Sequence, residues 1–214
     1  PEPGTTMPHL LHIECSPRKQ RSASIEVARS FIDTWSARHP QGTVDTLDVW
    51  SAALPEFNGS ALDAKYAGLE GRERSADEMR VWADIEALGQ RFHRADVIVF
   101  SVPMWNFGIP YRLKHLIDAA TQKDTLFTFD ERGLLGLLGG RSMVLVAARG
   151  VALGDDFPAA IYDHQVSYMS MWARMVGITE VHHVTVEKTL FGPEADTASR
   201  EQAKAQAQAL AQSL

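Results

Sequence analysis

Short apolar runs alternate with helical segments along almost the whole chain, and this alternation restricts the fold more than any other feature. In the helical segments apolar residues recur at spacings of three and four, so each helix presents one apolar face. A chain that alternates strands and helices in this way builds a parallel sheet with helices on both faces. The expected strands cover residues 10–15, 43–49, 96–101, 142–147 and 179–186, and the expected helices begin near residues 25, 75, 110, 160 and 194.

Two segments interrupt the alternation. Residues 50–74 are typical of a loop with one short helix at 60–67, and residues 121–140 form an excursion with an aromatic pair and a glycine-spaced leucine run. Local signals mark helix starts outside these segments. Ser75 and Glu78 have the spacing of a capping box, and Pro110 suits the first position of a helix. Capping chemistry therefore supports the boundaries that periodicity predicts.

Five strands with this spacing fit a flavodoxin-like three-layer α/β sandwich. Its five-stranded parallel sheet has the order 2-1-3-4-5 and carries helices on both faces. The chain has 214 residues, which suits one domain, and no repeat or low-complexity linker divides it. We expect a single domain over residues 9–214. Residues 1–8 are expected to be an N-terminal tail, part of which can be left over from expression.

The composition excludes several classes of protein. The net charge is −6 and no basic run stands out, so the electrostatic footprint of a nucleic-acid-binding protein is missing. No apolar segment reaches the roughly 18 residues that span a bilayer, and no signal peptide is recognisable. The single cysteine, Cys15, excludes an internal disulfide framework. We expect a cytoplasmic protein that binds neither nucleic acid nor membrane.

Topology predicts where a ligand binds. In this strand order the crevice lies beyond the carboxyl ends of the strands, at the switch between strands 1 and 3. Three loops meet there, formed by residues 16–24, 103–110 and 148–154. This prediction depends on the order of the strands and not on a motif.

The first loop has the chemistry that a phosphate monoester needs. Ser22, Ala23 and Ser24 lie at a predicted helix N-terminus, where free N–H groups and the helix dipole favour an anion. Ser16 adds a hydroxyl, and Arg18, Lys19 or Arg21 can supply positive charge. The alternative is that Ser22 or Ser24 merely caps the helix.

The second loop suits a flat aromatic ligand. Met104, Trp105 and Phe107 follow a buried strand, and Gly108 with the two flanking prolines restricts the backbone. The alternative is that these side chains cap the core beneath a tight turn. Beside a phosphate loop, however, this segment points to one ligand with both a phosphate and a flat ring.

Together these segments resemble the FMN-dependent NADH-azoreductase and quinone reductase family over nearly the whole chain. The resemblance is carried by Ser16 with Ser22-Ala23-Ser24, by 103–107 (Pro-Met-Trp-Asn-Phe), and by 147–150 (Ala-Ala-Arg-Gly). It implies that FMN is bound by the following residues: Ser16, Arg18, Ser22, Ala23 and Ser24 at the phosphate; Pro103, Met104, Trp105, Asn106 and Phe107 at the ring; and Ala148, Arg149, Gly150 and Val151 at the pyrimidine side.

Four residues depart from the pattern of that family. Ala148 lacks the usual hydroxyl, and Val151 stands where the family has a glycine that adopts positive φ more easily. Phe129 stands where a tyrosine often faces the flavin. In the ring segment, Trp105 replaces the usual tyrosine. Substrate preference can differ as a result.

The resemblance also implies a reaction. NADH or NADPH would reduce the flavin and leave, and a quinone or azo compound would then take two electrons, in a ping-pong mechanism. No catalytic side chain is expected, because the cofactor carries the redox chemistry. Family members are homodimers that share the acceptor pocket, to which Phe127, Phe129 and His164 are candidate contributors. Ordinary core or dimer packing is the alternative for the two phenylalanines.

Two other functions are compatible with parts of the sequence. A flavodoxin-type electron carrier would have the same FMN site, but such carriers are usually shorter and lack the 121–140 excursion. A low-molecular-weight tyrosine-phosphatase-like hydrolase would use Cys15 and Arg21, whose spacing matches its signature. That loop contains no glycine, however, and no Asp-Pro pair supplies a general acid. The eight histidines have no metal-ligand spacing, so no metal is expected.

Overall fold

The computed structural model describes residues 7–214, and its centre is one parallel sheet of five strands. The expectation for the tail falls mostly on residues 1–6, which lie outside the described residues. The strand order is β2-β1-β3-β6-β7, and every neighbouring pair is parallel. This confirms the predicted order, because β6 and β7 are the fourth and fifth strands of the prediction. The strands are β1 (His9–Glu14), β2 (Thr43–Asp48), β3 (Val97–Pro103), β6 (Ser142–Ala148) and β7 (Glu180–Val186).

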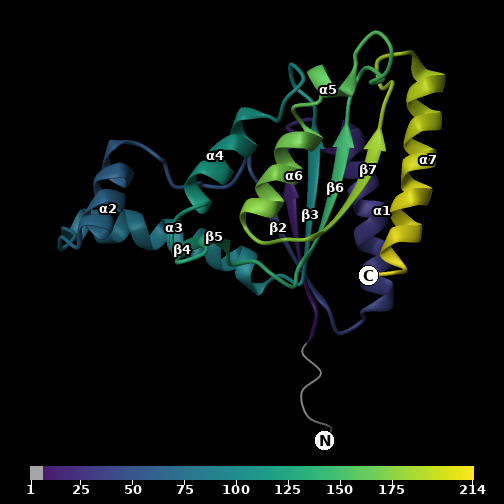
Figure 1. Ribbon diagram of the computed structural model, residues 1–214. Helices are drawn as coiled ribbons and strands as arrows, with labels where there is room; N and C mark the ends of the chain where they lie inside the picture. The colour runs from purple at the N-terminus through teal and green to yellow at the C-terminus, as the bar shows by residue number, and fades with distance from the viewer. Residues whose placement is uncertain (1–6) are drawn as a thin grey trace, which may run out of the picture.

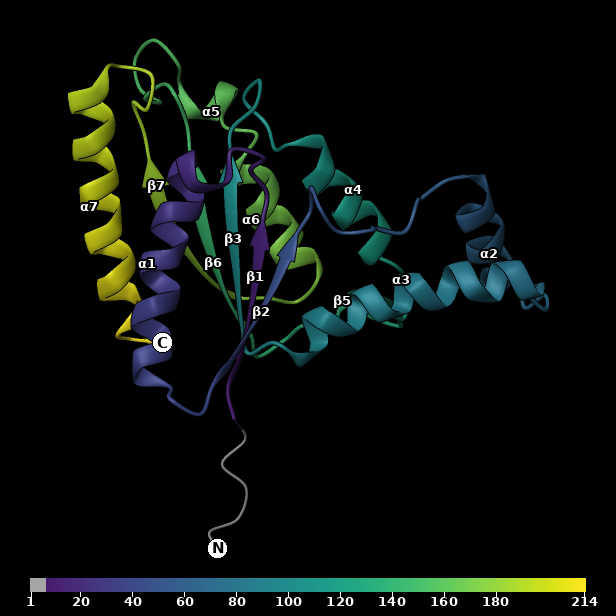
Figure 2. The same ribbon diagram turned by 180° about the vertical axis from the view of Figure 1, so that it is seen from behind.

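Helices cover both faces of the sheet (Figures 1 and 2). One face carries α1 (Ala23–Arg38) and α7 (Pro193–Ala211), and the other carries α3 (Ala76–Arg94), α4 (Tyr111–Ala120) and α6 (Val166–Met175). Successive strand residues point to opposite faces. Leu10 accordingly packs with Phe31 and Trp35 of α1, whereas Leu11 belongs to the core beneath α3, α4 and α6.

The 121–140 excursion is ordered as a β-hairpin, which the sequence did not predict. It contains β4 (Phe127–Asp130) and β5 (Gly133–Gly136), paired antiparallel outside the main sheet. Gly136 allows the hairpin to pack closely on the end of α6, because a Cβ there would lie 2.0 Å from the backbone nitrogen of Gly177. Figures 1 and 2 show the hairpin beside α3, far from the carboxyl ends of the strands.

The short helix predicted at 60–67 is longer than expected. α2 (Gly59–Glu70) ends at Gly71, whose φ of 68° is a left-handed conformation that glycine adopts readily. α2 and the first turns of α3 extend away from the sheet (Figures 1 and 2) and share a small core that includes Ala64, Trp82 and Ile85. The capping box at the start of α3 is formed by Ser75 and Glu78, as predicted.

Three helix boundaries differ from the prediction. The segment expected to form one helix from near residue 160 is divided into α5 (Ala159–Tyr162) and α6. Asp163 interrupts it, because its Oδ1 accepts hydrogen bonds from the N–H groups of Gln165 and Val166 and so begins a new helix. α4 begins at Tyr111, one residue after the predicted start at Pro110, and α7 begins at Pro193, one residue before the predicted start at 194. No helix among residues 7–214 is long and apolar enough to cross a membrane.

Candidate functional site

The predicted loops meet at the carboxyl ends of the strands and enclose a cavity of about 170 Å³. A fourth segment, which follows β7, completes its wall. Apart from Thr189 and Leu190 of that segment, every lining residue belongs to the predicted set. The cavity is lined by Ser16, Arg18, Ser22, Ala23, Pro103, Met104, Trp105, Ala148, Arg149, Gly150, Thr189 and Leu190.

The phosphate end of the cavity is the N-terminus of α1. The Ser22 side chain caps this helix by accepting a hydrogen bond from the N–H of Ile25, and its hydroxyl lies 3.1 Å from that of Ser24. Ser22 and Ser24 are both buried, as is Ser16. In the described chain the N–H groups of Ala23 and Ser24 have no acceptor, so they remain available to an anion. Capping and ligand binding are therefore compatible roles here.

Of the three cations in this loop, Arg18 lines the cavity. Lys19 has a φ of 51° and its ammonium forms ion pairs with Glu14 and Asp48. These carboxylates neutralise Lys19, which is therefore a structural residue and not a phosphate ligand. Arg21 does not line the cavity either, which leaves Arg18 as the cation that can approach a bound phosphate.

The second loop ends in a tight two-residue hairpin turn. Trp105 and Gly108 exchange both backbone hydrogen bonds, at 3.0 and 2.9 Å, and the two residues between them have positive φ. The values are 48° for Asn106 and 66° for Phe107, which identify a type I′ turn. Asparagine tolerates this conformation, but a bulky residue in the second position stores strain of about 1 to 3 kcal/mol. Strain of this kind is concentrated at functional sites.

Neighbouring residues hold the strained turn in place. The Phe107 ring packs against Tyr162 and Phe157, with centroids 4.9 and 5.5 Å apart. The carbonyl of Phe107 accepts a hydrogen bond from the N–H of His164 at 3.0 Å. His164 therefore lies directly against the ring loop, although it does not line the cavity, and its contribution to an acceptor pocket stays a prediction.

The third loop is organised by a buried arginine. The Arg149 side chain is 5 % exposed and lies between Asp163, at 3.3 Å, and Glu187, at 3.4 Å. Asp163 also begins α6, and Glu187 accepts a hydrogen bond from the N–H of Leu153. Arg149 thus joins the third loop to the segment after β7 and to α6. Removing Arg149 would destabilise this region, because it would leave two partly buried carboxylates without their cation.

Thr189 and Leu190 were missed by sequence reasoning. The N–H and hydroxyl of Thr189 donate to the carbonyl of Arg149, and the N–H of Leu190 donates to that of Gly150. A Cβ on Gly150 would lie 2.5 Å from a Leu190 methyl group, so the glycine permits this close contact. The available signal was topological: the loop after the fifth strand also emerges at the carboxyl edge of the sheet.

The backbone shows the consequences of two departures from the family pattern, those at Val151 and Ala148. Val151 is not among the residues with positive φ in the described chain, so the strain expected from replacing a glycine does not arise. Ala148 uses its carbonyl to accept a hydrogen bond from the N–H of Met104 at 2.7 Å. The ring loop is therefore anchored to β6 without a side-chain hydroxyl.

Not every predicted residue is at the cavity of this chain. Phe127 and Phe129 belong to the β4–β5 hairpin. The hairpin lies beside α3, near the C-terminal end of α4, whereas the ring loop precedes the N-terminal end of α4 (Figures 1 and 2). Their predicted contribution to the acceptor pocket therefore requires a second copy of the chain. Asn106, Phe107 and Val151 are adjacent in the chain to lining residues or to one another but do not line the cavity, and neither does Ser24, whose hydroxyl lies 3.1 Å from that of Ser22.

The environment of Cys15 argues against the phosphatase alternative. Its thiol is fully buried and lies 3.6 Å from the carbonyl of Ile13. Burial, with the nearby carboxylates of Glu14 and Asp48, raises the pKa of Cys15 well above its ordinary value. A nucleophilic cysteine needs the opposite, a lowered pKa and an accessible thiolate. Cys15 is thus a core residue.

A second buried polar group lies beneath the site. The His12 ring is 2 % exposed, and its Nε2 lies 3.0 Å from the Ser101 hydroxyl. Burial and the positive charge of Arg29 lower the pKa of His12 to about 4. His12 is therefore neutral at physiological pH and links β1 to β3. Among residues 7–214, no group of three or more His, Cys, Asp or Glu side chains could hold a metal ion.

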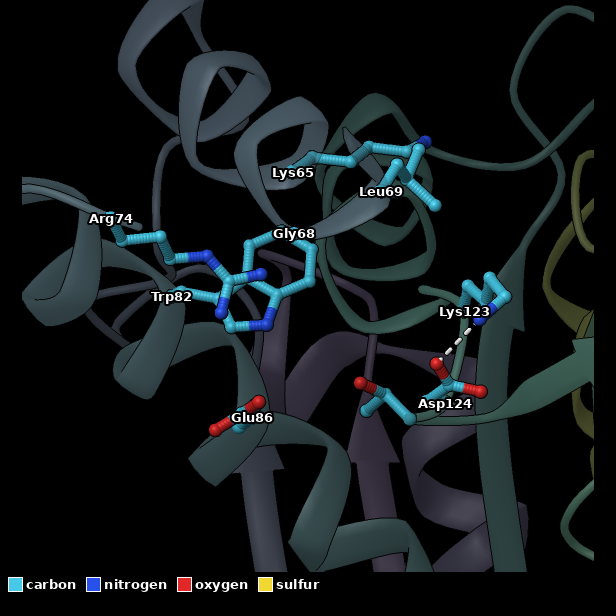
Figure 3. Close-up of a pocket in the computed structure, with 9 residues that line it drawn as sticks. Lys65, Gly68, Leu69, Arg74, Trp82, Glu86, Lys123 and Asp124 are labelled. Atoms are coloured by element: carbon cyan, nitrogen blue, oxygen red, sulfur yellow. Dashed lines mark hydrogen bonds and ion pairs between the residues drawn. The ribbon is translucent and has the colours of Figure 1, made fainter. Parts of the chain in front are cut away.

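A larger hollow of about 270 Å³ lies away from the strand ends, between α2, α3 and the turn at 123–125 (Figure 3). Several of its charged groups already have partners. The Arg74 guanidinium stacks 4.6 Å from the Trp82 ring and donates to the carbonyl of Ala64. Lys123 pairs with Asp124 at 2.7 Å. The contacts of Arg74 fasten α2 to α3, so this side of the hollow has a structural role.

Comparison with known proteins agrees with this geometry. The profile of a family described as having a flavodoxin-like fold matches residues 8–211. The chain is 53 % identical, over 203 residues, to FMN-dependent NADH:quinone oxidoreductase 2 of Pseudomonas syringae pv. tomato, covering 95 % of this chain and 97 % of that protein. It is 47 % identical to FMN-dependent NADH:quinone oxidoreductase 3 of Pseudomonas fluorescens, covering 97 % and 98 %.

Solved structures show the same fold at lower identity. An azoreductase from Bacillus anthracis superposes with a TM-score of 0.88 at 24 % identity, covering 97 % of this chain and all of that one. An FMN-dependent NADH-azoreductase from the same species, solved in complex with FMN, gives 0.84 at 24 % identity, with 96 % of this chain covered.

Proposed function

This chain belongs to the family of FMN-dependent NADH:quinone oxidoreductases with a flavodoxin-like fold, and we propose that it binds FMN and transfers two electrons from NADH to quinones. The observation that carries this proposal is the arrangement of one cavity. Ser16, Ser22 and Arg18 lie on its wall with the N-terminus of α1, and Met104 and Trp105 lie on another part of the same wall. A ligand with a phosphate and a flat ring fits such a cavity.

The residues present fit FMN on two counts. The unpaired N–H groups of Ala23 and Ser24, with the buried hydroxyls of Ser22 and Ser24, can donate to phosphate oxygens. Met104 is fixed to β6 through the carbonyl of Ala148, and Trp105 begins a rigid turn, so the ring would meet a preformed surface. Asn106 and Phe107 would complete the ring contacts from this turn. Gly150 and Val151 would line the pyrimidine side, where Arg149 holds the loop.

The protein supplies positioning rather than a catalytic side chain. When bound, FMN provides the chemistry of accepting a hydride and passing on two electrons. Arg149 keeps the third loop in place through Asp163 and Glu187. The strained turn at Asn106 and Phe107 fixes the ring wall. We propose that NADH and the acceptor use the site in turn, in a ping-pong mechanism, and that azo compounds are reductively cleaved by the same route.

The acceptor pocket requires a second subunit in this proposal. Phe129, Leu134 and Leu135 are 57 %, 45 % and 37 % exposed and lie together on the hairpin, so they form apolar surface that a partner can cover. A homodimer that buries this hairpin against the partner would bring Phe127 and Phe129 towards a second cavity, with His164 at its edge. Sedimentation equilibrium tests this: we expect a dimer, and Phe129→Ser should weaken it. A monomer with full quinone reductase activity would contradict the shared pocket.

The decisive experiment uses the purified protein. We expect a yellow protein whose released flavin co-migrates with FMN, and steady-state NADH oxidation by a quinone with no partner protein. Initial rates at varied NADH and quinone concentrations should give parallel double-reciprocal lines, as a ping-pong mechanism requires. The ratio of kcat/KM for NADH to that for NADPH identifies the preferred donor. FMN binding without turnover would instead favour a flavodoxin-type electron carrier. A colourless protein that cannot be reconstituted with FMN would refute the proposal.

A further inference from the structure

Three aromatic side chains from separate segments form a cluster beside the cavity. Trp50 follows β2, Trp105 belongs to the ring loop, and Tyr111 is the first residue of α4. The Trp50 centroid lies 5.6 Å from that of Trp105 and 5.2 Å from that of Tyr111. Trp105 and Tyr111 are 6.4 Å apart. These distances are typical of favourable aromatic pairs.

Trp50 is held rigidly although it lies in a loop. Its indole Nε1 donates to the carbonyl of Cys15 at 3.0 Å, and its backbone N–H donates to Asp48 Oδ1 at 3.0 Å. Arg112 of α4 donates to the carbonyls of Val49 and Ala52, on both sides of Trp50. The loop is thus fastened to Cys15, the residue after β1, and to α4, so little conformational entropy would be lost when a ligand stacks on the indole.

The cluster keeps exposed aromatic surface in spite of this anchoring. Trp105 is 37 % exposed and Tyr111 is 66 % exposed, while Trp50 is half-buried. Exposed aromatic surface in a neighbouring group of rings is a feature of binding sites rather than of ordinary surface. Trp105 also lines the proposed FMN cavity, so a ring that stacks on this cluster lies next to the cofactor.

The charge around the cluster indicates which of the two substrates, NADH or the electron acceptor, it suits. The neighbouring cations have other roles: Arg18 is assigned to the FMN phosphate, Arg112 binds loop carbonyls, and Lys19 pairs with Glu14 and Asp48. A dinucleotide donor carries two phosphates and would need free cations. An uncharged flat ring needs only aromatic surface. The cluster therefore suits the acceptor better than NADH.

We infer that Trp50, together with Trp105 and Tyr111, is a stacking platform for the flat ring of the electron acceptor, and that Trp50 determines the preference for multi-ring acceptors. This inference rests on the proposed function. No local sequence signal points to Trp50, because its place beside Trp105 and Tyr111 depends on contacts between segments distant in the chain.

The test compares Trp50→Leu and Trp50→Phe with the wild-type holoprotein and with Tyr66→Leu as a matched control. Tyr66 is 54 % exposed on α2, away from the strand ends. The acceptors are menadione, which has two fused rings, and ferricyanide, which has none. Menadione binding to the oxidised holoprotein is also measured without NADH, from the change in the flavin absorption band.

We expect Trp50→Leu to raise the KM and the Kd for menadione about 2- to 13-fold, the range that corresponds to loss of an aromatic pair of 0.5 to 1.5 kcal/mol. Trp50→Phe should retain most of the affinity. FMN content, the KM for NADH and ferricyanide reduction should stay at wild-type values, as should every parameter of Tyr66→Leu.

Three outcomes overturn the inference. Unchanged menadione binding in Trp50→Leu shows that the indole does not contact the acceptor. An equal loss with ferricyanide, or loss of FMN, shows that Trp50 only supports the fold. A raised KM for NADH alone shows that the donor uses the cluster. A wild-type protein without a flavin spectrum refutes the proposed function itself, which is established before any variant is compared.

Discussion

Replacement of Ser24 by alanine separates cofactor binding from helix stability. The Ser24 hydroxyl is buried, and its partner in the protein is the hydroxyl of Ser22, 3.1 Å away. Without ligand it forms one neutral hydrogen bond, worth about 1 kcal/mol. With phosphate present it would donate to a charged oxygen, and such bonds contribute roughly 1.5 to 3 kcal/mol. We therefore expect Ser24→Ala to weaken FMN binding about 10- to 100-fold while lowering the free energy of unfolding by about 1 kcal/mol or less.

Ser22→Ala is the matched comparison. It should weaken FMN binding by a similar factor, but it also removes the N-cap that accepts from Ile25. Loss of a cap costs typically about 1 kcal/mol, so the apoprotein of Ser22→Ala should be less stable than that of Ser24→Ala by about that amount.

The assay is titration of the apoproteins with FMN and, in parallel, with riboflavin, which lacks the phosphate. Urea unfolding of each apoprotein gives the stability difference. Riboflavin affinity should be the same in wild type and Ser24→Ala, because the hydroxyl acts on the phosphate alone. If Ser24→Ala weakens riboflavin and FMN equally, the hydroxyl does not face the phosphate and the assignment of this end of the cavity is wrong.

Three further predictions concern single residues. His12 has a lowered pKa of about 4 in the fold, against about 6.5 unfolded, so the unfolded chain binds the extra proton as the pH falls below 6.5. Between pH 7 and 5, wild type should lose about 2 kcal/mol more unfolding free energy than His12→Gln, and parallel curves would contradict this reasoning. Trp105→Ala should raise the Kd for FMN up to about 10-fold with the melting temperature nearly unchanged, since the side chain is 37 % exposed; a large fall in melting temperature at unchanged Kd would make Trp105 a core residue. Cys15 should react with a thiol reagent such as DTNB at pH 8 only after denaturation, and Cys15→Ser should leave NADH oxidation intact; rapid labelling of the native protein would refute burial of the thiol.

Much of the fold could be predicted because its signals are local. The alternation of strands and helices fixes a parallel sheet, and side-chain periods of two and of about 3.6 separate the two element types. The sequence did not predict the hairpin of β4 and β5, because its strands have only four residues each and lie outside the main sheet. The sequence also did not predict the division between α5 and α6. The Asp163 carboxylate accepts a hydrogen bond from the N–H of Val166 at the start of α6, and the spacing of apolar residues gives no sign of this bond.

By itself the sequence determined the sheet order, the loops that form the site and the chemistry of those loops. It could not decide which side chains of a loop face the ligand. Arg18 and Lys19 are adjacent cations, yet Arg18 lines the cavity while Lys19 turns back to Glu14 and Asp48. The positive φ of Phe107, the contact of Thr189 with Arg149 and the anchoring of Trp50 on Cys15 likewise depend on partners distant in the chain. The physical reason is that regular elements set side-chain directions by local geometry, whereas in loops long-range hydrogen bonds and ion pairs set them.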